Sequence, residues 1–170
     1  MEREDDPPQE GELTSRAPTE QDLVELCRTL NQQGARYLVV GGFAVMYSGH
    51  VRTTGDVDLL MATDPENEAK VFQSLATLPD KAVLELKPGE IAQYTVVRVA
   101  DEIVVDLMKS ASGIDYEEAA KDVVMRRVQD VEIPFASPRL LWRMKKNTHR
   151  EKDIPDLLFL RQQYPEVVDD

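Results

Sequence analysis

The hydrophobic residues near the start of the chain recur at helical spacing. Leu23, Leu26 and Leu30 follow one another at intervals of three and four residues, between Thr19 and Gly34. Threonine is a favoured N-cap, and glycine commonly ends a helix because it tolerates a left-handed backbone. The pattern therefore predicts one amphipathic helix between these two residues.

A short apolar run over residues 37–40 then predicts a β-strand, which stops at Gly41-Gly42. Residues 43–48 are expected to form a short helix closed by a glycine. Glycines between a strand and a helix let backbone amides approach an anion without obstruction by side chains. This segment is therefore a candidate phosphate-binding unit, although a glycine pair alone is more often a simple turn.

The rest of the chain alternates between further strand and helix patterns. We expect strands at 56–61, 82–86, 91–99 and 102–108, helices at 65–78 and 116–122, a hairpin of 123–128 with 131–135, and two helices starting at Pro138 and near Glu151. Strands gathered in runs rather than in regular alternation with helices favour a small mixed or antiparallel sheet.

Three aspartates lie within these strand patterns. Asp56 and Asp58 are two residues apart, so their side chains leave the same face of one strand. Asp106 occupies a second strand, and if the two strands pair, the three carboxylates converge. The alternative is that Asp106 forms an ion pair with Arg98 on the preceding strand and lies far from Asp58. Taken alone, an Asp-x-Asp pair is more often a solvated strand edge, and an aspartate among valines can be explained by an ion pair.

Carboxylates that converge repel one another unless a cation is bound among them. Magnesium prefers carboxylate and phosphate oxygens and commonly joins a polyphosphate to one or two protein carboxylates. The cluster therefore predicts a divalent metal site for phosphate chemistry, with Mg²⁺ as the expected ion and Mn²⁺ as a substitute.

Composition and charge narrow the picture further. The 170-residue chain has a formal net charge of −12 and one cysteine, Cys27. We expect a disordered acidic tail over 1–18, one domain over 19–170, a reducing cytoplasmic setting and no membrane span. The negative charge argues against non-specific nucleic-acid binding.

The chain resembles a known family at two places. The first reads Gly41-Gly42-x-Ala44, then Gly49-x-x-Arg52-x-Thr54-x-Asp56-Val57-Asp58-Leu59-Leu60; the second reads Ser137-Pro138, Leu140-Leu141, Lys145, Arg150, Lys152-Asp153 and Asp156-Leu157. Both resemble motifs of the AbiEii-type and minimal branches of the polymerase-β-like nucleotidyltransferase superfamily. A serine common after the glycines is Phe43 here.

This resemblance implies an α+β nucleotidyltransferase fold with helices on one side of the sheet and C-terminal helices. It implies an enzyme that transfers a nucleoside monophosphate from a nucleoside triphosphate such as ATP to a hydroxyl of a protein, a tRNA 3′ end or a small molecule. Asp56, Asp58 and Asp106 would hold two metal ions, and Gly41, Gly42, Arg52, Thr54 and Lys145 would contact the nucleotide.

Two roles remain open at this stage. The enzyme would belong to a toxin–antitoxin pair if a small protein partner is encoded in the same operon. The alternative is a catalytically silent interaction module with the same fold, which acts as an antitoxin-like binding protein. The intact set of three aspartates favours the enzyme, because no structural requirement would preserve all three.

Overall fold

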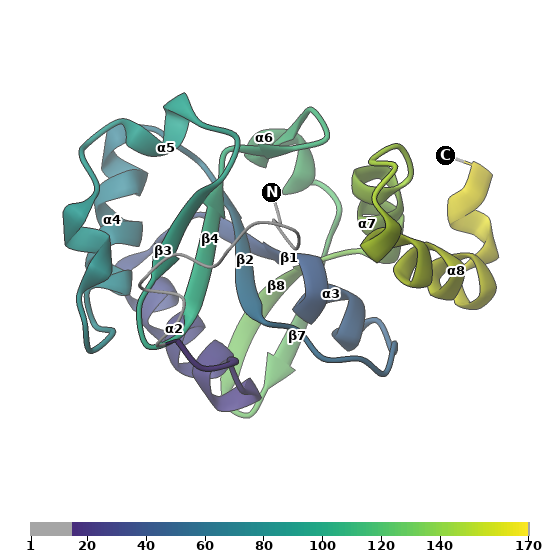
Figure 1. The fold of residues 1–170 in the computed structure, drawn as a ribbon, viewed down its shortest axis with the longest axis horizontal. Coiled ribbons are helices and arrows are strands. Elements are labelled where there is room, and N and C mark those ends of the chain that lie inside the picture. The colour runs from purple at the N-terminus through teal and green to yellow at the C-terminus, as the bar shows by residue number, and fades with distance from the viewer. Residues whose placement is uncertain (1–14, 170) are drawn as a thin grey trace.

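The computed structural model describes residues 15–169. In this part of the chain a six-stranded mixed sheet has the order β3-β4-β2-β1-β8-β7, with α2 and α4 behind it and α7 and α8 beyond one side (Figure 1). The strands are β1 (Tyr37–Val40), β2 (Asp56–Met61), β3 (Val97–Ala100), β4 (Val104–Met108), β7 (Val123–Val128) and β8 (Val131–Ala136).

The helices connect and flank these strands. They are α2 (Glu20–Gln33), α3 (Gly41–Tyr47), α4 (Pro65–Leu75), α5 (Glu90–Gln93), α6 (Tyr116–Ala119), α7 (Pro138–Lys145) and α8 (Ile154–Gln163), with 3₁₀ turns η1 (Ala82–Glu85), η2 (Glu151–Asp153) and η3 (Pro165–Asp169). No helix among the described residues is both long and apolar enough to cross a bilayer. The predicted α+β class with a small sheet and C-terminal helices is confirmed.

The centre of the sheet is the antiparallel pair of β1 and β2, and each of these two strands has a parallel neighbour on its other side. β2 runs antiparallel to β1 and parallel to β4, and β1 runs parallel to β8. The outer pairs, β3 with β4 and β7 with β8, are antiparallel. The central strands are buried on both faces, with Leu38, Leu59 and Leu107 fully inaccessible to solvent.

The elements with strong local signals agree with the sequence. Thr19 caps α2 in a capping box with Asp22, and Gly34 ends the helix with a left-handed backbone at φ 71°. β2 has the predicted bounds, and the predicted hairpin is β7 and β8. These signals depend only on neighbouring residues, so tertiary contacts do not alter them.

One predicted strand is absent and a second is correct only in part. Residues 82–86, predicted as a strand, form η1, because the buried carboxylate of Asp101 accepts backbone hydrogen bonds from Asp80 and Ala82 at 2.9 and 2.8 Å. These bonds fold the segment into a turn. The predicted strand at 91–99 is divided into the end of α5 and the four-residue β3. A short hairpin of β5 (Ser110–Ala111) with β6 (Ile114–Asp115) was not predicted.

Residues 15–18 lie against the body of the domain. The Ser15 hydroxyl donates to the Asp101 carbonyl, and the Arg16 backbone amide donates to the Glu102 carbonyl. The predicted tail over 1–18 otherwise falls on residues 1–14, which lie outside the described part of the chain. The predicted domain boundary therefore stays a prediction.

The side chain of Asn67 on α4 connects the residue before β1 to the residue after β2. Its side-chain amide donates to the carbonyls of Ala62 and Arg36 and accepts from the Arg36 backbone amide, at 2.7, 3.0 and 2.7 Å. Asn67→Ala would remove all three hydrogen bonds, including the buried one to Ala62, and should lower the free energy of unfolding by about 2–4 kcal/mol. Urea denaturation measures this change. The exposed Asn147→Ala is the control, and equal effects of both substitutions would contradict the assignment.

Candidate functional site

Strand register brings the predicted acidic residues into one row across the sheet. Asp58 on β2 lies opposite Val40 on β1 and opposite Asp106 on β4, and Asp106 lies opposite Arg98 on β3. Residues directly opposite in paired strands point to the same face. The backbone pairing alone therefore gathers Val40, Asp58, Asp106 and Arg98 on one face.

Asp56 lies on the same face as this row, because it is two residues before Asp58 on the same strand. Asp56, Asp58 and Asp106 each offer one oxygen, and these three oxygens lie within 4.8 Å of one another. Asp56 and Asp106 are only 7% and 2% exposed, so water screens their charges poorly. Three oxygen ligands at this spacing fit a hard divalent cation such as Mg²⁺ or Mn²⁺.

Arg98 contacts two of the three carboxylates. Its Nε and Nη2 donate to the two oxygens of Asp106, both at 2.9 Å, and its Nη2 also donates to Asp56 at 3.2 Å. The sequence offered the ion pair with Arg98 and the proximity to Asp58 as alternatives. The structure contains both, because β3 and β2 flank β4 on opposite sides.

The two glycines begin helix α3 instead of forming a turn before it. Gly41 has φ 67°, and a Cβ atom there would lie 1.9 Å from Asp58 Oδ2. A Cβ atom on Gly42 would lie 2.5 Å from Thr54 Oγ1. Both glycines are therefore required for close packing against β2 and the loop before it, whatever their contacts with a nucleotide.

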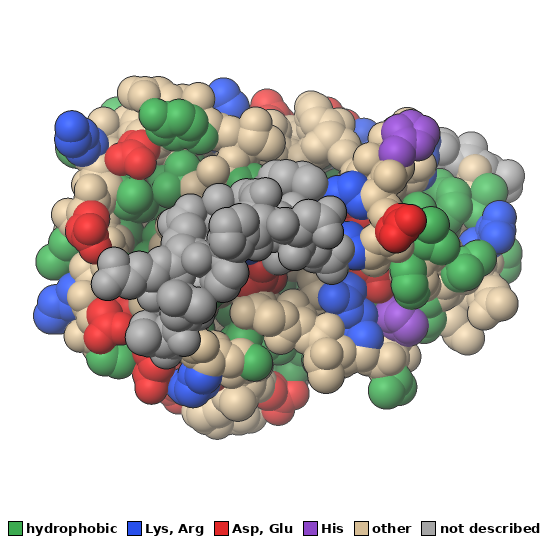
Figure 2. Space-filling model, viewed as in Figure 1, with side chains coloured by type: hydrophobic (Ala, Val, Ile, Leu, Met, Phe, Trp, Pro, Cys, Tyr) green, Lys and Arg blue, Asp and Glu red, His purple; other side chains and the backbone are tan. Residues whose placement is uncertain are grey.

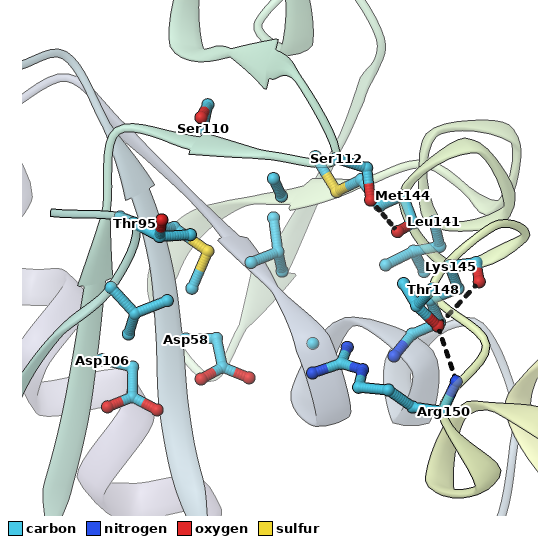
Figure 3. Close-up of a pocket in the computed structure, with 15 residues that line it drawn as sticks. Asp58, Thr95, Asp106, Ser110, Ser112, Leu141, Met144, Lys145, Thr148 and Arg150 are labelled. Carbon is cyan, nitrogen blue, oxygen red and sulfur yellow. Dashed lines mark hydrogen bonds between the residues drawn. The ribbon is translucent and has the colours of Figure 1, made fainter. Parts of the chain in front are cut away.

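A cavity of about 290 Å³ opens beside the acidic cluster. Asp58 and Asp106 lie side by side at one wall, and Arg150 reaches in from the opposite wall (Figure 3). The other lining residues are Val40, Gly41, Thr95, Val96, Met108, Ser110, Ala111, Ser112, Leu141, Met144, Lys145 and Thr148. The mixture of apolar surface, hydroxyl groups and a few charged side chains is typical of a small-molecule site.

Lys145, predicted to contact the nucleotide, lines this cavity but already has two acidic partners. Its ammonium group lies 2.9 Å from Asp153 and 3.3 Å from Asp156. Burial alone would raise the pKa of Asp153, but Lys145, Thr148 and Arg150 together lower that pKa below its usual range. The network ties α7 to the start of α8.

Arg52 and Thr54, also predicted nucleotide contacts, lie outside this cavity. Arg52 forms an ion pair with Asp156 at 2.6 Å, and Thr54 donates to the Asp56 carbonyl at 3.1 Å. Both line a second cavity, next to α3. In the structure they therefore support the loop that leads into β2.

Two basic residues at the site were not assigned a role from the sequence. Arg98 was considered only as a rival partner of Asp106, and Arg150 only as part of the second motif. Basic and acidic side chains gather between the sheet and the C-terminal helices (Figure 2). The signal for Arg98 was the hairpin symmetry: a turn centred on Glu102 places residue 98 opposite residue 106.

Solved structures share this fold. An antigenic nucleotidyltransferase-like protein from Paracoccidioides brasiliensis is 16% identical, with a TM-score of 0.53 over 88% of this chain and 79% of that one. The lincosamide antibiotic adenylyltransferase LnuA, solved with lincomycin bound, is 17% identical, with a TM-score of 0.54 over 86% and 98%. A candidate nucleotidyltransferase from Thermotoga maritima is 14% identical, with a TM-score of 0.51 over 88% and 97%.

At these identities the likeness establishes the fold alone, and no curated protein matches the chain significantly. A family model provides the closer assignment. It matches residues 19–168, nearly the whole of the described chain, and confirms the nucleotidyltransferase superfamily expected from the motifs. The chain belongs to the family described as nucleotidyl transferases of unknown function (DUF2204).

Proposed function

We propose that the protein is a metal-dependent enzyme that transfers a nucleoside monophosphate from a nucleoside triphosphate to a hydroxyl acceptor. The observation that carries this proposal is the meeting of Asp56, Asp58 and Asp106 beside a cavity. Two divalent ions, Mg²⁺ by preference, would be held by these carboxylates and would supply charge stabilisation for the transferred phosphoryl group. Asp58 and Asp106 face the cavity in which the nucleotide would lie.

In this reaction the acceptor oxygen attacks the α-phosphorus and forms a new P–O bond. The bond from the α-phosphorus to the bridging oxygen breaks, and pyrophosphate leaves. Asp106 is the candidate to take up the hydroxyl proton, on a lone pair that its two hydrogen bonds from Arg98 do not occupy. Lys145 and Arg150, which line the opposite wall, would contact the phosphates.

The buried ion-pair network supports a role for the C-terminal helices in closing the cavity. Lys145 on α7 and Arg52 before β2 both contact Asp156 on α8. These pairs hold α7, α8 and the loop before β2 around one carboxylate. We propose that Gly41 and Gly42 position α3 beside the phosphates, and that Arg52 and Thr54 act indirectly, by supporting that loop.

The acceptor is proposed from the resemblance and from one neighbour. A protein hydroxyl, a tRNA 3′ end and a small molecule are the candidate classes. LnuA was solved with lincomycin bound and is matched over 98% of its length, so small hydroxylated molecules are the first acceptors to test. The AbiEii-type branch, a toxin–antitoxin pairing and a partner from the same operon are further proposals that identification of the acceptor would test.

Asp58→Asn tests the proposed chemistry. We expect transfer of labelled nucleotide to fall at least about a thousandfold, while the melting temperature stays within a few degrees, because removing one of three like charges relieves repulsion. The assay combines the protein, Mg²⁺, each labelled nucleoside triphosphate and cell extract. Asp80→Asn, an exposed carboxylate outside the cluster, is the matched control.

A second readout separates the enzyme from the silent module. Nucleoside triphosphate with Mg²⁺ should raise the melting temperature of the unaltered protein, since a ligand that binds only the folded state stabilises it. The same ligand should raise the melting temperature of Asp58→Asn much less. Absence of both transfer and stabilisation at millimolar ligand would reject the enzyme in favour of the interaction module.

Asp153→Asn tests the network that closes the cavity. Loss of this carboxylate charge removes one of the two acidic partners of Lys145 and the ion pair of Arg150 with residue 153, and should lower the free energy of unfolding by about 2–3 kcal/mol at pH 7. Because the folded-state pKa of Asp153 is lowered, its contribution is complete above the unfolded pKa and is lost as the pH falls through the folded value. The difference in the free energy of unfolding between the unaltered protein and Asp153→Asn should therefore shrink below about pH 4. Urea titrations at several pH values measure it, and a constant difference would contradict the assignment.

A further inference from the structure

Arg98 occupies an unusual place for a residue next to a metal-binding cluster. It reaches the carboxylates from edge strand β3 and contacts both Asp106 and Asp56. Its side chain is only 13% exposed, so these contacts are made in a poorly screened environment. The guanidinium group is positively charged at any physiological pH.

This position gives Arg98 two effects on the cluster. It cancels one unit of the negative charge of Asp56, Asp58 and Asp106, which would otherwise repel one another in the absence of a metal. It also donates to both oxygens of Asp106 in the two-pronged geometry that guanidinium groups form with carboxylates. A cation that approaches the cluster therefore meets a weaker field and oxygens that already accept hydrogen bonds.

We propose that Arg98 is a built-in counter-ion that competes with divalent metal for Asp106 and Asp56. Its presence keeps the affinity for metal alone low, and a nucleoside triphosphate, which brings its own negative charge and oxygen ligands, restores tight metal binding. The inference rests on the proposed function and adds to it a dependence of metal uptake on the nucleotide. A residue that merely braces β3 against β4 would leave metal affinity unchanged or would weaken it when replaced.

The test measures Mn²⁺ binding to the nucleotide-free protein, with unbound Mn²⁺ counted by electron paramagnetic resonance. Arg98→Gln should lower the dissociation constant about tenfold or more, because a unit charge a few ångströms away is removed from a poorly screened site. Arg98→Lys keeps the charge but cannot donate to both oxygens of Asp106 at once. Its dissociation constant for Mn²⁺ should therefore lie between those of the unaltered protein and Arg98→Gln. Arg127→Gln, on β7 at the opposite edge of the sheet, changes the net charge equally and should have no effect.

Three further measurements test whether the effect arises at the acidic cluster. Adding Asp58→Asn to Arg98→Gln should abolish the gain in Mn²⁺ affinity, and a non-hydrolysable triphosphate should reduce the difference between Arg98→Gln and the unaltered protein. Mn²⁺ should also raise the melting temperature of Arg98→Gln more than that of the unaltered protein. If Arg98→Gln does not fold, the comparison of Arg98→Lys with Arg127→Gln carries the test.

The outcomes separate this inference from the proposed function. An unchanged or weakened Mn²⁺ affinity in Arg98→Gln and Arg98→Lys, with metal binding and nucleotide transfer intact in the unaltered protein, would overturn the counter-ion role alone. If neither the unaltered protein nor the variants bind Mn²⁺ at millimolar concentration, with or without triphosphate, both the metal site and the counter-ion role are rejected.

Discussion

Asp58 lies directly opposite Asp106 in a parallel pair of central strands, and Asp56 adds a third carboxylate on the same face. Like charges at such positions destabilise a sheet unless a cation lies among them. The surrounding structure meets this constraint with Arg98, which is fixed opposite Asp106 by the hairpin of β3 and β4. The position of the edge strand is therefore tied to the electrostatics of the site.

The same constraint extends to the backbone around the cluster. Gly41 leaves room for the Asp58 carboxylate, because any Cβ atom there would overlap it. The opposite wall of the cavity carries the reverse arrangement, in which the buried Asp153 and Asp156 surround the ammonium group of Lys145. Asp56 and Asp106 on one wall, and Lys145 on the other, thus each have an internal partner of opposite charge.

The sequence predicts those features of the fold and site that depend on contacts between neighbouring residues. It does not predict those that depend on residues far apart along the chain. Thr19 and Gly34 mark the first helix through contacts with their own neighbours, and the spacing of Asp56 and Asp58 fixes a shared strand face. Residues 82–86 were misassigned because Asp101, far along the chain, provides the hydrogen bonds that turn them. Lys145, which the motif predicts as a nucleotide contact, lines the cavity, but no local pattern shows that two aspartates already contact it.

The internal pairing of charges has a consequence for how a ligand enters. A site whose buried charges are satisfied can fold without its ligands, because no unpaired charge has to be desolvated. With Arg98 as counter-ion, as proposed above, a metal ion alone competes with its guanidinium group, and a triphosphate alone competes with Asp153 for Lys145 and Arg150. A metal–nucleotide pair supplies both replacement charges at once, the cation to the carboxylates and the anion to the basic wall. The arrangement therefore favours the joint binding of metal and nucleotide over the binding of either one.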